Sequence, residues 1–168
     1  MLAMPLLYLV RHGIAEARSA SGRDDDRGLA QDGVHEMQRA AAGLARLDMH
    51  VHAIWASPLL RARQTAEILR DALAPGLELA IQPGLRPEGD VDAVMQELQA
   101  ASDVEARMLV GHEPSISALG SALLTGSTSG VRLPFKPGSV PAIERASAAG
   151  RGTLRWFVTA EQLGQPRK

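Results

Sequence analysis

LYLVRHG, residues 7–13, is an apolar run that ends directly in an arginine, a histidine and a glycine. Residues 6–10, bounded by Pro5 and Gly13, have the pattern of a strand buried on both faces. Such strands are typical of parallel sheets that are covered by helices on both sides. Because ligands bind beyond the carboxyl ends of the strands in such sheets, Arg11 and His12 are placed where a binding site is expected.

The rest of the chain alternates short apolar runs with segments of helical periodicity. Apolar runs at 53–56, 78–81 and 108–110 predict strands, and helical spacing predicts helices from residue 32 with Leu47 as the last apolar position, from 57 to 73, over 91–100 and from 115 to about 124. A turn at Gly150 and Gly152 before residues 154–158 predicts a terminal hairpin. We therefore expect a single domain over residues 1–168, a three-layer α/β/α sandwich around a mainly parallel sheet with a C-terminal antiparallel addition.

Composition excludes several classes of protein. The chain has 168 residues, a net charge of −1, 45% hydrophobic and 22% charged residues, which is typical of one globular domain. The absence of cysteine excludes disulfides, cysteine nucleophiles and thiolate metal sites. Near-neutral charge and 3% aromatic residues argue against nucleic-acid binding, and the lack of a long apolar run argues against a membrane span. We expect a cytoplasmic protein, and its excess of arginine over lysine hints at a GC-rich bacterial genome.

Three polar clusters follow predicted strands and should meet at one edge of the sheet. They are Arg11-His12, residues 57–63 and Gly111-His112. All three are rich in cations or imidazoles, and helix N-termini at this edge offer unpaired N–H groups. The shared site should therefore bind an anion with several oxygens, and phosphate is the natural candidate.

Helical geometry separates two arginines of the second cluster. Ser57 and Pro58 are suited to the N-cap and first position of the helix that follows. At about 100° per residue, Arg61 falls on the apolar face, whereas Arg63 falls beside its ion-pair partner Glu67 on the opposite face. An inward arginine needs an anion, which either a bound phosphate or a distant aspartate or glutamate can supply.

These segments together resemble a known family. LYLVRHG at 7–13, SPLLRARQTA at 57–66 and LVGH at 109–112 are similar to the histidine phosphatase, or phosphoglycerate mutase-like, superfamily. LRPEGD at 85–90 and KPGSVPAI at 136–143 resemble its small SixA-type phosphohistidine phosphatases. The resemblance implies the same fold and a substrate protein phosphorylated on histidine, such as a phosphotransfer domain of a signalling relay. The sequence has no Walker loop, dinucleotide fingerprint, EF-hand or zinc protease motif, so we expect no cofactor and no metal.

The resemblance also implies the roles of the site residues. His12 would be the nucleophile that is transiently phosphorylated, and Arg11, Arg61 and His112 would bind the phosphoryl oxygens. A neutral imidazole can attack phosphorus while fixed cations stabilise the equatorial oxygens, so we expect a neutral His12 and preferably a cationic His112 when substrate binds.

Chain length bears on which bond is cleaved. Larger superfamily members that cleave phosphate esters carry an acidic proton donor and a large insertion, for which this chain has no room. When the P–N bond of a phosphohistidine breaks, the leaving group is an imidazole, which is easily protonated. The short chain therefore favours P–N over P–O cleavage. Glu88 is either a solvent-facing loop residue or an acid, whereas Asp90 is better explained as a helix N-cap. The alternatives are a small-molecule phosphomonoesterase with Glu88 as general acid and a non-catalytic module that binds phosphoproteins.

Several other polar residues have simpler interpretations. The charged run at 23–27 is typical of a solvated loop, although the resemblance places Arg27 near the site rim. His50 and His52 lack a third ligand and are expected on the surface rather than at a metal. Ser57 and Thr65 are better explained by capping and packing than as nucleophiles.

Overall fold

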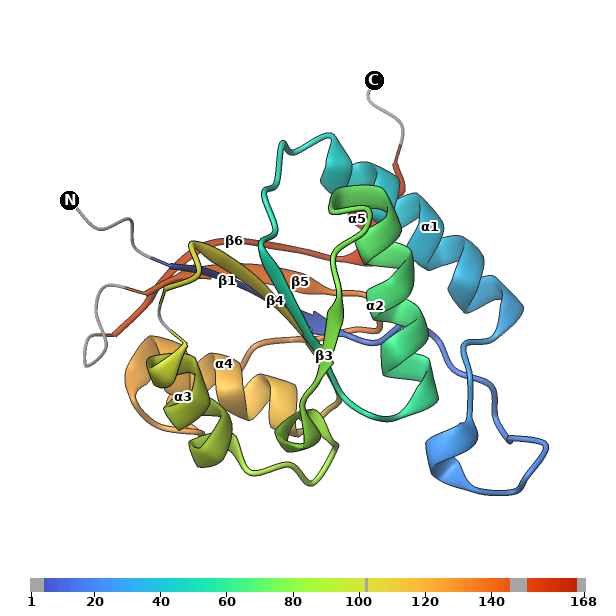
Figure 1. The fold of residues 1–168 in the computed structure, drawn as a ribbon, viewed down its shortest axis with the longest axis horizontal. Helices are drawn as coiled ribbons and strands as arrows, with labels where there is room; N and C mark the ends of the chain where they lie inside the picture. Colours follow the sequence, from blue (N-terminus) through green and yellow to red (C-terminus); the bar gives the residue numbers. More distant parts are fainter. Residues whose placement is uncertain (1–4, 102, 146–150, 166–168) are drawn as a thin grey trace.

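A single mixed sheet organises the structure, a computed structural model that describes residues 5–101, 103–145 and 151–165 (Figure 1). The sheet order is β3-β2-β4-β1-β5-β6. Its strands are β1 (Leu6–Arg11), β2 (Ala53–Ala56), β3 (Leu79–Ile81), β4 (Ala106–Gly111), β5 (Val140–Glu144) and β6 (Thr153–Val158). The first four are parallel, whereas β5 and β6 are antiparallel additions. The predicted terminal hairpin pairing is therefore confirmed, although Gly150 of its turn lies outside the described residues.

Helices cover both faces of the sheet, which confirms the predicted three-layer sandwich (Figure 1). One layer consists of α1 (Gln31–Ala45), α2 (Leu60–Leu73) and the short α5 (Ala160–Leu163); the other consists of α3 (Val91–Ala100) and α4 (Ser115–Thr125). Two short 3₁₀ helices, η1 (Asp24–Asp26) and η2 (Pro83–Leu85), lie in the connections. Among the described residues, no helix combines the length and apolar character that crossing a bilayer requires.

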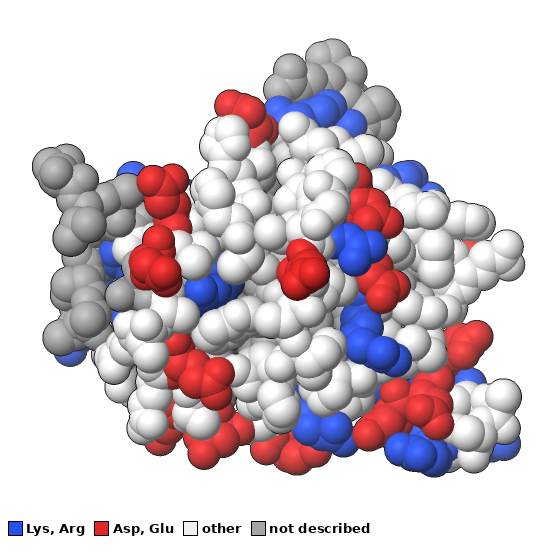
Figure 2. Space-filling model, viewed as in Figure 1, with Lys and Arg blue, Asp and Glu red and all other residues white. Residues whose placement is uncertain are grey.

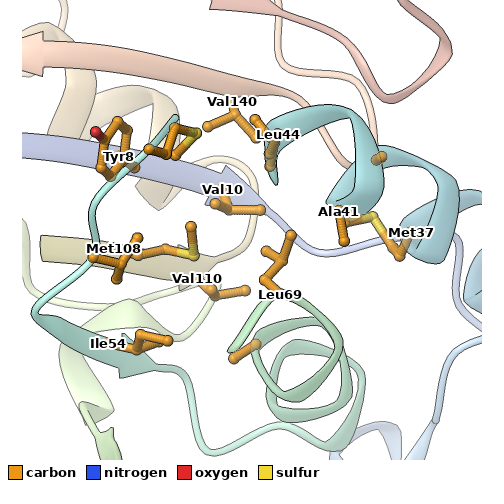
Figure 3. Packing of buried hydrophobic residues seen from close by; sticks show 14 of the residues in the cluster. Tyr8, Val10, Met37, Ala41, Leu44, Ile54, Leu69, Met108, Val110 and Val140 are labelled. Carbon is orange, nitrogen blue, oxygen red and sulfur yellow. The ribbon is translucent and has the colours of Figure 1, made fainter. Parts of the chain in front are cut away.

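Alternation along β1 explains why its residues 6–10, before Arg11 at the carboxyl end, are all apolar. Tyr8 and Val10 belong to the cluster that packs under α1 and α2, as Figure 3 shows for its central members. Leu7 and Leu9 belong to the cluster that packs against α3 and α4. Successive side chains of a strand point to opposite faces, so the part of a strand that lies between two helical layers is apolar on both faces.

Two helix boundaries differ from the sequence prediction. Helix α2 begins at Leu60 rather than just after Ser57, because the backbone stays extended at Leu59, whose side chain is buried. Helix α1 ends at Ala45, and Leu47 is 48% exposed beyond it. The predicted N-cap of α3 is confirmed, since the Asp90 carboxylate accepts a hydrogen bond of 3.1 Å from the Ala93 N–H.

Gly33 links the fold to the segment that follows His12. A Cβ atom at Gly33 would lie 2.1 Å from the carbonyl oxygen of Ile14. We expect Gly33→Ala to destabilise the protein by about 1–3 kcal/mol through this overlap, although the same change in an open helix stabilises by about 1 kcal/mol. Urea denaturation compared with Gln31→Ala, an exposed position in the same turn, measures the difference. A Gly33→Ala variant more stable than the parent would contradict this close approach.

Candidate active site

The two histidines meet because β1 and β4 are neighbouring parallel strands. Arg11 pairs with Gly111 in register, and the His12 N–H donates a hydrogen bond of 3.1 Å to the Gly111 carbonyl. The imidazole centroids of His12 and His112 are 4.8 Å apart, with their planes inclined at 53°. The carboxyl ends of β1 and β4 therefore bring together the two imidazoles that the sequence singled out.

The ring of His12 is held with one nitrogen available for attack. Its Nδ1 lies 2.7 Å from the carbonyl oxygen of Gly13. A carbonyl can only accept, so Nδ1 carries the hydrogen and Nε2 keeps its lone pair. Burial is the main cause that lowers the pKa of His12 to about 4; the positive charges of Arg61, Arg11 and Arg27 also lower it, whereas the Gly13 hydrogen bond raises it. At neutral pH His12 is thus an uncharged imidazole, the form that a nucleophile requires.

His112 is more deeply enclosed than His12. The residue is 2% exposed, and its Nε2 lies 2.8 Å from the hydroxyl oxygen of Ser57. Its Nδ1 is buried without a hydrogen-bond partner among the residues that the structure describes. Burial, followed by the charges of His12 and Arg61, lowers the pKa of His112 to about 3. His112 is therefore neutral at pH 7, because desolvation disfavours the charged ring, and the cation preferred when substrate binds stays a prediction.

Helix α2 supplies the inward arginine and supports the loop after His12. The Arg61 side chain is 6% exposed, whereas Arg63 is exposed, as the helical geometry predicted. The hydroxyl of Thr65 accepts a 3.1 Å hydrogen bond from the Gly13 N–H and donates one of 2.7 Å to the Arg61 carbonyl. One turn of α2 thus sets the position of the arginine relative to the nucleophile, and Thr65 has the structural role expected of it.

Asp24 supplies an anion for the inward arginine. Its carboxylate accepts hydrogen bonds from Arg61 Nη2 at 2.9 Å and from Arg27 Nη1 at 2.7 Å, while its carbonyl accepts from Arg61 Nη1 at 2.9 Å. The hydrogen bond from Arg61 is the main cause that lowers the pKa of Asp24. The sequence left open whether a bound phosphate or a distant carboxylate provides the anion that Arg61 needs. The structure shows that the carboxylate of Asp24 does. A guanidinium has five N–H donors, so Arg61 can bind a phosphoryl oxygen as well.

The charged run at 23–27 is not simply solvated, which corrects the sequence interpretation. Both carboxylate oxygens of Asp25 accept from Arg86 Nη2, at 3.0 and 2.9 Å. The Arg86 carbonyl in turn accepts a 2.7 Å hydrogen bond from the Ser115 hydroxyl at the start of α4. The loop therefore connects α2 to the segment around α4, and Figure 2 shows acidic and basic side chains gathered over it.

Besides Arg61, Arg11 and Arg27 carry charges that act on His12. Nη1 of Arg11 donates a 2.8 Å hydrogen bond to the Phe135 carbonyl, and its Nε is buried without a partner among the described residues. Nε of Arg27 donates to the Glu16 carbonyl at 2.7 Å. Both guanidinium groups lower the pKa of His12, which shows that their positive charges act on the site.

Glu88 lies beside the charged loop. Its carboxylate forms a 3.3 Å ion pair with Nε of Arg86, and its side chain is 73% exposed. The role of Glu88 as a proton donor stays a prediction, because its described partner is an arginine rather than either imidazole.

No group of three histidine, aspartate or glutamate side chains gathers to hold a metal within the described part of the chain, and His50 and His52 are both exposed.

Comparison with known proteins identifies the family. The family model described as histidine phosphatase superfamily (branch 1) matches residues 7–92, which contain His12 and Arg61. Phosphohistidine phosphatase SixA of Escherichia coli strain K12 is 31% identical over 152 residues, which cover 89% of this chain and 91% of SixA. The chain belongs to the histidine phosphatase superfamily. Membership of this superfamily and the similarity to SixA support phosphatase activity.

Two further comparisons extend this histidine phosphatase relationship. A solved structure of the protein histidine phosphatase SixA complexed with tungstate superimposes on this structure with a TM-score of 0.85 at 28% sequence identity. The superposition covers 94% of this chain and 99% of the SixA chain. An uncharacterized protein of Picosynechococcus is 40% identical over 125 residues, covering 73% of this chain and 74% of that protein. The phosphoglycerate mutase-like fold predicted from the sequence is thus confirmed over nearly the whole chain.

The ion pairs of the 23–27 loop predict a local effect on its dynamics. We expect Asp24→Asn to raise amide hydrogen exchange across residues 22–28 by about tenfold, because the loop loses charge-assisted hydrogen bonds to Arg61 and Arg27. Asp26→Asn is the matched control, since Asp26 contacts Ser21 and Arg23 of the same loop. Equal exchange in the two variants would show that Asp24 does not anchor the loop.

Proposed function

We propose that this histidine phosphatase removes the phosphoryl group from a phosphorylated histidine of a signalling protein, such as a phosphotransfer domain, through a covalent phospho-His12 intermediate. The observation that carries the proposal is the hydrogen bond from His12 Nδ1 to Gly13, which leaves Nε2 free to attack. The similarity to SixA supports phosphohistidine as the substrate class. No metal and no cofactor take part in the proposed reaction.

The proposed first step transfers the phosphoryl group to the enzyme. The lone pair of His12 Nε2 attacks phosphorus, and the P–N bond to the substrate imidazole breaks. The substrate imidazole, whose other ring nitrogen carries a hydrogen, leaves as a neutral ring and takes the P–N electron pair on the nitrogen that had carried phosphorus. Arg11, Arg61 and the Nδ1 side of His112 bind the three equatorial oxygens, on which charge is spread in the transition state.

The second step regenerates the enzyme with water. Water attacks the phosphorus of phospho-His12, the P–Nε2 bond breaks with its electron pair returning to Nε2, and inorganic phosphate leaves with both hydrogens of the water. The hydrogen on Nδ1 of His12 is donated to the Gly13 carbonyl throughout, so the ring keeps one orientation in both steps. Because the departing ring of each step already carries a hydrogen on its other nitrogen, this cycle needs less help from an enzymic acid than ester cleavage does.

An exposed groove that includes Arg86, whose positive charge lowers the pKa of His112, supports a protein as substrate. It has a volume of about 390 Å³ and is lined in part by Arg86, Glu88 and Asp90, which carry charges of both signs. A groove of this kind suits the charged surface around a phosphohistidine on another protein. SixA is a protein of Escherichia coli, and we place the proposed reaction in the cytoplasm of a bacterium.

Single-turnover mass spectrometry tests the proposed function. The enzyme is mixed with phosphoramidate, with a phosphorylated histidine phosphotransfer domain or with a phosphate monoester, and phosphate on the enzyme is located by peptide mapping. We expect label on His12 that decays as phosphate is released, with the phosphoprotein turned over faster than the ester. Faster turnover of the ester would favour the phosphomonoesterase alternative, in which Glu88 is the acid. Binding of the phosphoprotein without label or release would favour a binding module.

A further inference from the structure

Ser57 is a buried hydroxyl that the proposed chemistry does not use directly. The residue follows β2 and is 0% exposed. Its oxygen lies 2.8 Å from Nε2 of His112 and 3.3 Å from the backbone nitrogen of Leu59. The hydroxyl therefore contacts the imidazole whose other nitrogen, Nδ1, is buried and without a partner among the described residues.

The direction of the bond between Ser57 and His112 follows from the hydrogens available. A backbone N–H can only donate, so Leu59 gives its hydrogen to the Ser57 oxygen. If Nε2 of His112 also donated, the hydrogen of the Ser57 hydroxyl would be left without an acceptor among the contacts of the described residues. A buried donor without an acceptor is unfavourable. The arrangement that satisfies all three groups has the Ser57 hydroxyl donating to Nε2.

We propose that Ser57 is a positioning residue that places the ring hydrogen of His112 on Nδ1, so that His112 donates a hydrogen bond to the transferred phosphoryl group. Nε2 then holds a lone pair that accepts from Ser57, and the single hydrogen of the neutral ring resides on Nδ1. The inference rests on the proposed function, because it assigns the acceptor of Nδ1 as a phosphoryl oxygen.

The tautomer decides whether His112 attracts or repels the substrate. His112 lies 4.8 Å from the ring of His12, measured between centroids, and both rings are neutral at pH 7 because burial lowers the pKa of each. A neutral ring with its hydrogen on Nε2 would present a lone pair at Nδ1 to an anionic oxygen. With the hydrogen on Nδ1, the same ring is a donor that needs no proton from solvent. Donors aimed at developing charge are the groups that accelerate phosphoryl transfer.

The first test reads the tautomer without substrate. Nitrogen-15 NMR of the free enzyme at pH 7 distinguishes protonated from unprotonated ring nitrogens, and the His112→Asn variant assigns the signals. We expect Nδ1 protonated and Nε2 unprotonated in the parent protein, with the population shifted toward Nε2–H in Ser57→Ala. Ser57→Thr keeps the hydroxyl and should keep the parent tautomer. An Nε2–H tautomer in the parent protein would overturn the proposal.

The second test measures the rate of His12 phosphorylation, the step in which His112 would donate its Nδ1 hydrogen. We expect Ser57→Ala to slow phosphorylation of His12 by phosphoramidate about tenfold or more, and Ser57→Thr to restore most of the rate. Ser121→Ala is the matched control, because Ser121 is equally buried but lies in α4. Its hydroxyl donates to the Ser127 carbonyl rather than to an imidazole. A parent rate in folded Ser57→Ala would overturn the positioning role.

The two readouts separate this inference from the proposed function. If the parent protein shows the Nδ1–H tautomer but never acquires label on His12, the proposed function fails while the tautomer assignment to Ser57 stands. If His12 is labelled but His112 is the Nε2–H tautomer, the proposed function stands and the role of Ser57 is wrong. Should Ser57→Ala fail to fold, the parent tautomer and the rate of Ser57→Thr still decide the question.

Discussion

We expect His12→Ala to abolish turnover of phosphoramidate, with a loss of about 10⁴-fold or more. The substitution removes the nitrogen that attacks phosphorus, and no neighbouring group can form the same covalent intermediate. The neighbouring imidazole of His112 cannot substitute, because its Nε2 is engaged with Ser57. Steady-state release of inorganic phosphate measures the loss, and mass spectrometry should find no phosphate on the variant.

The control for His12→Ala separates catalysis from binding. Arg11, Arg61 and His112 remain in place, so the variant should still bind inorganic phosphate within about tenfold of the parent affinity, measured by isothermal titration calorimetry. His35→Ala removes an exposed imidazole from α1 and should leave the rate unchanged. A His12→Ala variant that retains the parent rate would show that the phosphoryl group does not pass through His12.

Arg61→Ala should produce the second largest loss, about 10³-fold in kcat/KM for phosphoramidate. The guanidinium is nearly inaccessible to solvent and lowers the pKa of both imidazoles, which places its charge where phosphoryl oxygens would bind. Arg61→Lys should recover only part of the loss. The ammonium group of lysine lacks the planar guanidinium, whose several N–H groups can donate to Asp24 and to a phosphoryl group at the same time.

Arg63→Ala is the matched control for Arg61→Ala. It removes the same functional group from the same helix, two residues later, at a position exposed to solvent. Its kcat/KM should stay within about twofold of the parent value, because exposed charges away from a site contribute little. Equal losses in the two variants would show that net charge, and not the inward position of Arg61, carries the effect.

The fold and the central site were predictable because their signals are local. The apolar run before Arg11 indicates a strand that is covered on both faces, and the structure shows β1 with neighbours in both helical layers. The spacing of Arg61 and Arg63 separates an inward from an outward arginine by helical rotation alone. His12 and His112 each follow directly on a strand, so adjacency of β1 and β4 is sufficient to bring them together.

The charged loop shows why other parts of the site were missed. Asp24 and Arg61 are 37 positions apart, and Asp25 and Arg86 are 61 apart, so no periodicity connects them. A run of acidic residues in a loop is typical of solvated chain, and the sequence carries no signal that distinguishes the two cases. The start of α2 was misplaced for a related reason: Ser57 was available as a helix cap, but its hydroxyl bonds to the buried ring of His112.

The sequence by itself determined the layered architecture, the two imidazoles and the inward arginine, because each depends on periodicity or on the position of a residue directly after a strand. Only the tertiary structure decided the neutral state of His112, the hydroxyl that faces it and the aspartates that hold the arginines. These properties depend on burial and on hydrogen bonds between distant segments, and such contacts exist only once the sheet has brought those segments together.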